Sequence, residues 1–204
     1  MEINKALDQI SEIHGQLAKA EAFRGYRAGP IALTGLLAIS GAFLQARFVA
    51  DPASFAFVSY WAVVAVICLI TGGAGISYNY LTQEDAPARR HTRIVVGQFL
   101  PSLVAGLMVT VTITLLEPSF ISLLPGFWAI IYSLGIFASR PYLPRIIGWV
   151  GLYHLAAGIL ILALNKYDAN SAAWGMGLSF GPGQLLAALV FYLDYERKTN
   201  GEKK

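Results

Sequence analysis

The chain has 204 residues, of which 56% are hydrophobic and 13% charged, and its mean hydropathy is +0.56. Soluble domains carry about 25% charged residues, so the composition excludes an ordinary soluble domain. It also excludes a disordered chain, which would combine low hydrophobicity with high charge. The net charge is +3, but the basic residues lie between long apolar runs. The charge therefore indicates membrane topology and not nucleic-acid binding.

Residues 1–28 predict a cytoplasmic amphipathic helix, formed by residues 2–24. They carry eight charges and no apolar core, so we expect no signal peptide. One face is apolar and contains Ile3, Leu7, Ile10, His14 and Leu17. Acids and bases balance up to Arg27, whereas helices held on anionic lipid are basic. The stripe therefore predicts docking on the protein's own bundle, a second copy or another protein, and the alternative is a helix lying on the headgroups.

Six apolar stretches are long enough to cross a bilayer, which takes about 20 helical residues. They lie at residues 29–47, 54–77, 94–116, 119–138, 145–164 and 171–193. The predicted fold is an all-α, six-helix transmembrane bundle over residues 29–193, followed by a basic tail at 194–204. Cys68 is the only cysteine and lies in an apolar stretch, so neither an intrachain disulfide nor a cysteine metal cluster is expected.

The distribution of Lys and Arg predicts the orientation. Thirteen of them fall in the N-terminal segment, the second and fourth loops and the tail, and the other loops hold only Arg47 and Lys166. Basic residues in short loops mark the cytoplasmic side. We therefore expect a multi-pass protein of the bacterial inner (cytoplasmic) membrane with both termini in the cytoplasm.

The three predicted outer turns are similar to one another. They begin at Asp51, Glu117 and Asp168, and Pro follows the acid in the first two. An acidic or hydroxyl cap with Pro in the first turn is a good helix start. The turns are therefore either three independent caps or the mark of three copies of one helical hairpin.

Several of these segments resemble known membrane proteins. Residues 35–41 (Gly-Leu-Leu-Ala-Ile-Ser-Gly), with the turn at Asp51, resemble the hairpin unit of HdeD-type acid-resistance membrane proteins, and residues 151–158 resemble a later copy. Residues 124–128 and 174–184 resemble a group of bacterial six-helix membrane proteins without an established activity. The resemblance implies a compact six-helix bundle in a bacterial inner membrane, and it supplies no catalytic residues.

A polar site is predicted near the membrane midplane, where the fifth and sixth spans meet. His154 lies in the middle of the fifth span, and Pro182 interrupts the sixth. Proline leaves the carbonyl of Leu178, four residues earlier, without its helical donor. Gly151 and Gly158 share the face of His154, whereas Gly177, Gly181 and Gln184 share a face of the sixth span, at 100° per residue. We expect these two faces to meet and His154 to bond Gln184 or the Leu178 carbonyl.

This site has several interpretations. It is a structural clamp between helices, or part of a substrate pathway, because ionisable groups and broken helices mark such pathways. Residues 177–181 match the hydrolase pattern G-x-S-x-G, but Ser179 is predicted to point away from His154 and no acid is nearby. Haem would need a second axial ligand, for which the sequence offers only Met108, Met176 or the His154 of a second copy. No catalytic, metal-binding or cofactor-binding residues are therefore expected.

The predicted function is a non-enzymatic accessory, stress-response or regulatory component of the inner membrane. The alternative is a small transporter or channel for a neutral or weakly polar solute, built around His154 and the sixth span. The expected partners are the lipid bilayer and, through residues 2–24, a second copy or another protein, with no nucleic acid and no cofactor.

Overall fold

The computed structural model describes residues 27–82, 86–165 and 171–196, and within these ranges the chain forms helices and no strands. Six helices are long and apolar enough to cross a membrane, which confirms the all-α six-helix bundle. The helices are α2 (Ala28–Phe48), α3 (Phe55–Thr82), α4 (Ala86–Leu116), α5 (Leu124–Ser139), α6 (Ile147–Asn165) and α7 (Ser171–Phe191). The short elements are the 3-10 helices η1 (Pro118–Leu123) and η2 (Arg140–Tyr142) and the π-turn η3 (Tyr192–Glu196).

The predicted docking helix at residues 2–24, with Ile3, Leu7, Ile10, His14 and Leu17, lies outside the described residues, as does most of the tail. Three helix boundaries differ from the prediction by five residues or more. Helix α3 continues to Thr82 and α4 begins at Ala86, so both extend past the apolar spans expected at 54–77 and 94–116. Helix α5 begins at Leu124 and not at the predicted residue 119, because the 3-10 helix η1 precedes it. Hydropathy locates the part of a helix that suits lipid, and a helix continues into polar sequence because its backbone bonds are internal.

The first two outer turns differ in structure. In the first, the Asp51 carboxylate accepts a hydrogen bond from the Ala53 amide at 2.8 Å, and the Ser54 hydroxyl accepts one from the Phe57 amide at 3.3 Å, at the start of α3. In the second, Glu117 forms no side-chain cap and a 3-10 helix precedes α5. The third turn, at 166–170, is outside the described residues. The difference favours independent caps over copies of one hairpin.

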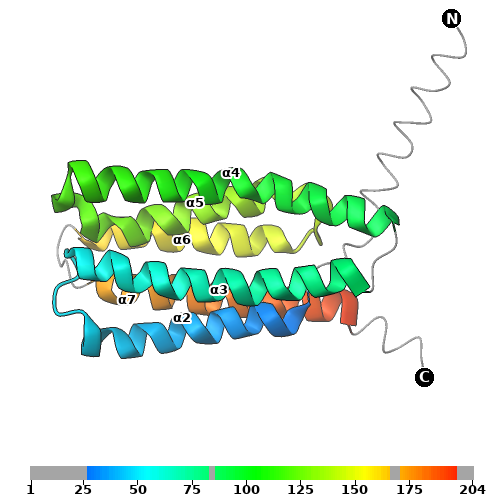
Figure 1. Cartoon of the computed structure of the whole chain (residues 1–204), viewed down its shortest axis with the longest axis horizontal. Coiled ribbons are helices and arrows are strands. Elements are labelled where there is room, and N and C mark those ends of the chain that lie inside the picture. Colours follow the sequence, from blue (N-terminus) through cyan, green and yellow to red (C-terminus); the bar gives the residue numbers. More distant parts are fainter. Residues whose placement is uncertain (1–26, 83–85, 166–170, 197–204) are drawn as a thin grey trace, which may run out of the picture.

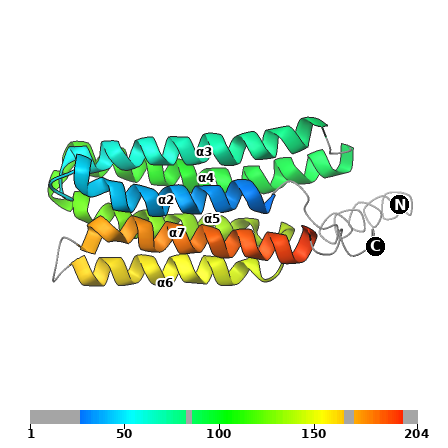
Figure 2. The same cartoon turned by 90° about the horizontal axis from the view of Figure 1, so that it is seen from below.

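The helices align along one axis, and they pack unevenly (Figure 1). Helix α7 lies between α2 and α6, while α3 lies on the side of the bundle away from α6 (Figure 2). The most extensive contacts join α2 to α7 and α5 to α6, and α3 and α4 touch little although they are consecutive. The first and last helices of the bundle are thus close neighbours, and the α3–α4 pair is peripheral.

Glycines lie in the two most extensive helix contacts. A methyl group built at Gly35 of α2 would lie 2.9 Å from the carbonyl oxygen of Gly181 in α7. A methyl group at Gly158 of α6 would lie 2.8 Å from the carbonyl oxygen of Gly126 in α5. Backbones approach this closely only where side chains are absent, as in small-residue contacts between membrane helices.

The predicted meeting of the two glycine faces is therefore wrong. Gly177 and Gly181 of α7 pack against Ala42 and Ile39 of α2. On α6, a methyl group at Gly151 would lie 2.9 Å from the Phe137 ring of α5, and Gly158 also faces α5. Helical periodicity shows which residues share a face, but it does not say which neighbouring helix that face meets.

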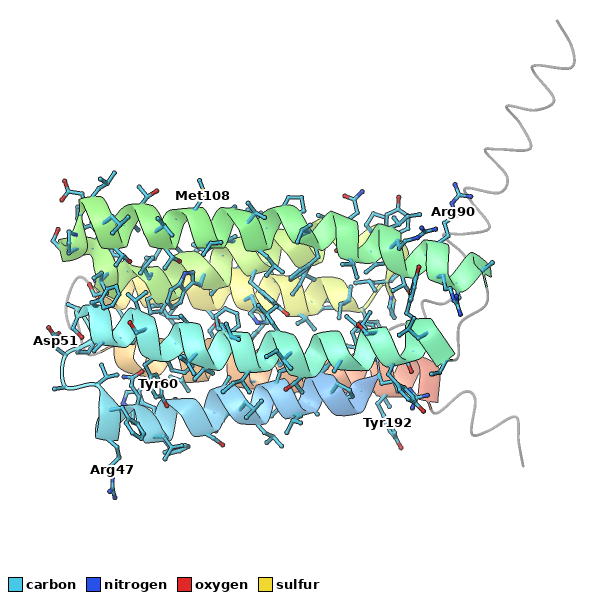
Figure 3. The ribbon with its side chains drawn as sticks, in the orientation of Figure 1. Arg47, Asp51, Tyr60, Arg90, Met108 and Tyr192 are labelled. Carbon is cyan, nitrogen blue, oxygen red and sulfur yellow. The ribbon has the colours of Figure 1, made fainter. Side chains whose placement is uncertain are left out.

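Charge separates the two ends of the bundle. Arg90 lies at one end, and Arg47 and Asp51 lie at the other (Figure 3). The end with Arg90, here called the arginine-rich end, has most of the arginines in the described ranges. These are Arg27, Arg89, Arg90, Arg93, Arg140 and Arg145.

Candidate functional site

A layer of polar side chains crosses the middle of the bundle between two apolar clusters. We call it the polar layer, and it consists of Tyr132, Tyr153, His154, Ser179 and Gln184. The cluster on the arginine-rich side contains Ile136, Ile147, Val150, Ala187 and Phe191. The cluster on the other side contains Ala42, Val49, Phe57, Val58, Trp61, Ile121, Leu124 and Met176. The polar layer therefore lies at the depth predicted for His154.

His154 is completely buried, with 0% of its surface exposed. Its Nδ1 lies 2.9 Å from the carbonyl oxygen of Val150, one turn earlier in α6. A carbonyl only accepts, so this bond assigns the imidazole proton to Nδ1 and leaves Nε2 as an acceptor. No described residue donates a hydrogen bond to Nε2.

Aromatic rings and a glycine enclose the imidazole. The ring centroids of Tyr132, Phe180 and Tyr153 lie 4.9, 5.5 and 5.6 Å from that of His154. On the remaining side, a methyl group built at Gly183 of α7 would lie 2.5 Å from Nε2. The glycine allows α7 to approach the imidazole, which is closed off from the surface of the bundle.

The predicted partners of His154 are wrong, because the two groups bond tyrosines instead. The Gln184 amide donates to the Tyr132 hydroxyl at 2.5 Å, which joins α7 to α5. The Leu178 carbonyl accepts a hydrogen bond from the Tyr153 hydroxyl, which joins α7 to α6. The carbonyl that Pro182 leaves without a helical donor does find one, as expected at membrane depth, but the donor is Tyr153.

The other predicted site residues fall in different places. Gly181 faces α2 and is not part of the polar layer. The Leu178 side chain is exposed on the outside of the bundle, and only its carbonyl takes part. Pro182 is partly buried in α7. The structure therefore brings His154 and Gln184 into one layer and leaves Gly181 out.

The prediction that Ser179 points away from His154 is also wrong. Ser179 is 0% exposed and lies one turn before Gly183, so both are on the face of α7 that meets His154. Its hydroxyl has no hydrogen-bond partner among the described residues, so it does not form the Ser–His pair that hydrolysis requires. Asp51, Glu117 and Asp194, the acids whose side chains are described, lie at the ends of the bundle.

The described ranges contain no group of three His, Cys, Asp or Glu side chains that could hold a metal ion. His91 is the other described histidine, and it lies at the start of α4, where its Nε2 is 3.0 Å from the carbonyl oxygen of Tyr142. It is therefore not available as a second axial ligand beside His154. The polar layer offers hydrogen bonds and aromatic packing around one buried histidine.

Sequence reasoning missed the two tyrosines of the polar layer and the two residues of α7 that enclose His154. Tyr132, Tyr153, Phe180 and Gly183 were not among the predicted site residues. Tyrosine in membrane helices is enriched at the interfaces, so a tyrosine in the middle of an apolar span was a usable signal at Tyr132. No comparable signal distinguished Gly183 from the glycines that face α2.

No family model matches the sequence, and no curated protein or solved structure matches it significantly.

Proposed function

We propose that this protein is a non-enzymatic accessory, stress-response or regulatory component of the bacterial inner membrane, with both termini in the cytoplasm. The observation that carries the proposal is the packing of the polar layer. His154 is enclosed by three aromatic rings and by Gly183, where a methyl group would lie 2.5 Å from Nε2. A ligand site in the membrane needs polar groups that face a cavity, whereas His154 is enclosed by packed rings, and Tyr132 and Tyr153 are bonded to Gln184 and to the Leu178 carbonyl.

The charge distribution supports the proposed orientation. Six of the arginines in the described ranges lie at the arginine-rich end, and Arg47 lies at the other. Basic residues in short loops are retained on the cytoplasmic side. Reporters fused after Lys204 and, separately, within the α2–α3 turn at Pro52 test this orientation. We expect cytoplasmic and periplasmic signals respectively, and the reverse result would overturn the proposed orientation.

A partner experiment tests the regulatory role. The complete chain and a variant lacking residues 2–24 are expressed at equal levels, cross-linked in intact cells and analysed for adducts. We expect a discrete adduct, either a dimer or a complex with another protein, that disappears in the truncated variant. A triple change of Leu7, Ile10 and Leu17 to Ser keeps the segment length and is expected to have the same effect. Identical adducts in all three proteins would contradict docking through this segment.

One observation favours a second function, a small transporter or channel for a neutral or weakly polar solute. The Nε2 of His154 and the hydroxyl of Ser179 are buried in the membrane interior without a described hydrogen-bond partner. His154 packs against α7 and Ser179 belongs to it, and α7 is a continuous helix with Pro182 inside it, not the interrupted helix that the sequence predicted. Polar groups at this depth are typical of transport pathways.

Proteoliposomes distinguish the two functions. Vesicles with the complete protein are exposed to a gradient of glycerol or urea, and swelling is recorded at several pH values. Transport predicts swelling faster than in empty vesicles, with loss of that excess in His154→Ala and Ser179→Ala. Rates equal to those of empty vesicles support the non-transport function for these two solutes.

A further inference from the structure

A groove opens between α3 and α4 at the arginine-rich end, outside the polar layer. Its volume is about 420 Å³, and it is lined by the last turns of α3, around Ile76 and Tyr80, and the first turns of α4, around Arg93 and Gly97. Helices α3 and α4 touch little over their whole length. The groove lies between the end of α3 and the start of α4, where the chain connects the two helices.

One part of the groove is cationic. Arg93 is exposed and lines it. Arg89 lies one turn earlier on the same face of α4, with its guanidinium 5.5 Å from the centre of the Tyr80 ring and 3.4 Å from the Leu81 carbonyl oxygen. Tyr80 and Leu81 also line the groove, so two guanidinium groups adjoin it. None of the lining residues is acidic, while Glu84 and Asp85, in the connection, lie outside the described residues.

The part of the groove farther along α4 is apolar and open. Ile76 of α3 and Val96 of α4 line it. A methyl group built at Gly97 would meet no atom within 4 Å, in contrast to the crowded glycines of α2, α5 and α6. Arg89, Arg93 and Gly97 recur every four residues, so the cationic and open parts follow one face of α4.

We propose that this groove binds an anionic phospholipid, with its phosphate on Arg93 beside Arg89 and an acyl chain along Gly97. Arginine pairs with phosphate through two parallel hydrogen bonds, and Ser77 and Tyr80 add hydroxyl groups to the lining. Basic pockets between membrane helices are a known type of site for anionic headgroups. A free phosphate would leave the apolar part empty, and a zwitterionic lipid carries a second charge that repels the two arginines.

The binding test uses the full chain in a mild detergent. Native mass spectrometry measures bound phosphatidylglycerol and phosphatidylcholine over a concentration series. We expect phosphatidylglycerol to bind more tightly, and Arg93→Gln to weaken it about fivefold, the effect of about one basic residue at an anionic lipid surface. Arg90→Gln is the matched control, because Arg90 is on the same helix but points away from the bundle (Figure 3). Equal binding of the two lipids, or equal losses in the two variants, would overturn the proposal.

The acyl-chain part is tested by filling the groove. Gly97→Leu is expected to weaken phosphatidylglycerol binding, because the new side chain takes the space of the acyl chain. Gly29→Leu is the control, since Gly29 also has open space around it but lies on α2, away from the groove. Glycerol phosphate separates a lipid from a free phosphate. Displacement of phosphatidylglycerol by millimolar glycerol phosphate, or binding unchanged by Gly97→Leu, would contradict a lipid site.

Discussion

The α5–α6 contact and the α3–α4 pair are both formed by consecutive helices, yet their packing is opposite. Between α5 and α6, Gly126 and Gly158 bring the two backbones so close that each would collide with a methyl group on the other. Around α3 and α4, Gly72, Gly73 and Gly97 have open space. In lipid, apolar side chains alone do not hold helices together, because lipid tails are equally apolar. Close packing of small residues does hold them together. The position of a glycine therefore matters more than its presence.

The largest expected effect is that of Gly158→Ala. The new methyl group would lie 2.8 Å from the Gly126 carbonyl oxygen, and two backbones cannot separate without loss of packing. We expect the free energy of unfolding to fall by about 3 kcal/mol, measured by denaturant titration in mixed micelles. Gly97→Ala is the matched control and should be neutral or stabilising by up to about 1 kcal/mol, because alanine restricts the unfolded chain. Equal effects of the two substitutions would remove the distinction between close and open contacts.

The second prediction concerns the contact between α7 and His154. A methyl group at Gly183 would overlap the imidazole, but a side chain yields more easily than a backbone. We expect Gly183→Ala to lower the free energy of unfolding by about 2 kcal/mol. In a His154→Ala background the same substitution should have a much smaller effect, because the obstacle is gone. Additive losses in the double variant would show that Gly183 is needed for another reason.

The sequence predicted the six helices, since apolar length depends on local composition and on bilayer thickness. It also predicted that the polar centre of the bundle involves His154, Gln184 and the Leu178 carbonyl that Pro182 leaves without a helical donor. The pairing of these groups was not predictable, because it depends on which helices are neighbours. The Leu178 carbonyl bonds Tyr153, and Gln184 bonds Tyr132. Both tyrosines lie in apolar stretches whose composition does not distinguish them from residues that face lipid.

The third prediction tests the pairing of Gln184 with Tyr132, which replaces the predicted pairing with His154. Hydrogen bonds between membrane helices contribute about 0.6 kcal/mol on average and at most about 1.7 kcal/mol. We expect Tyr132→Phe and Gln184→Leu to be destabilising and coupled by an energy in this range in a double-mutant cycle. Tyr153→Phe with Gln184→Leu is the control cycle, because Tyr153 bonds the Leu178 carbonyl instead. Stronger coupling in the control cycle would contradict the described pairing.

The smallest change in the free energy of unfolding is expected for a substitution on the outer face of α4. Met108 is 61% exposed and points away from the bundle (Figure 3), whereas Val95 on the same helix is 0% exposed. Met108→Ala should change the free energy of unfolding by less than about 0.5 kcal/mol, because lipid or detergent replaces the lost contacts. Val95→Ala removes fewer atoms but should be destabilising by about 1 kcal/mol or more, because the cavity stays inside the protein. If Met108→Ala were the more damaging, this face of α4 would pack against protein, and the peripheral α3–α4 pair would be an interface between copies of the chain.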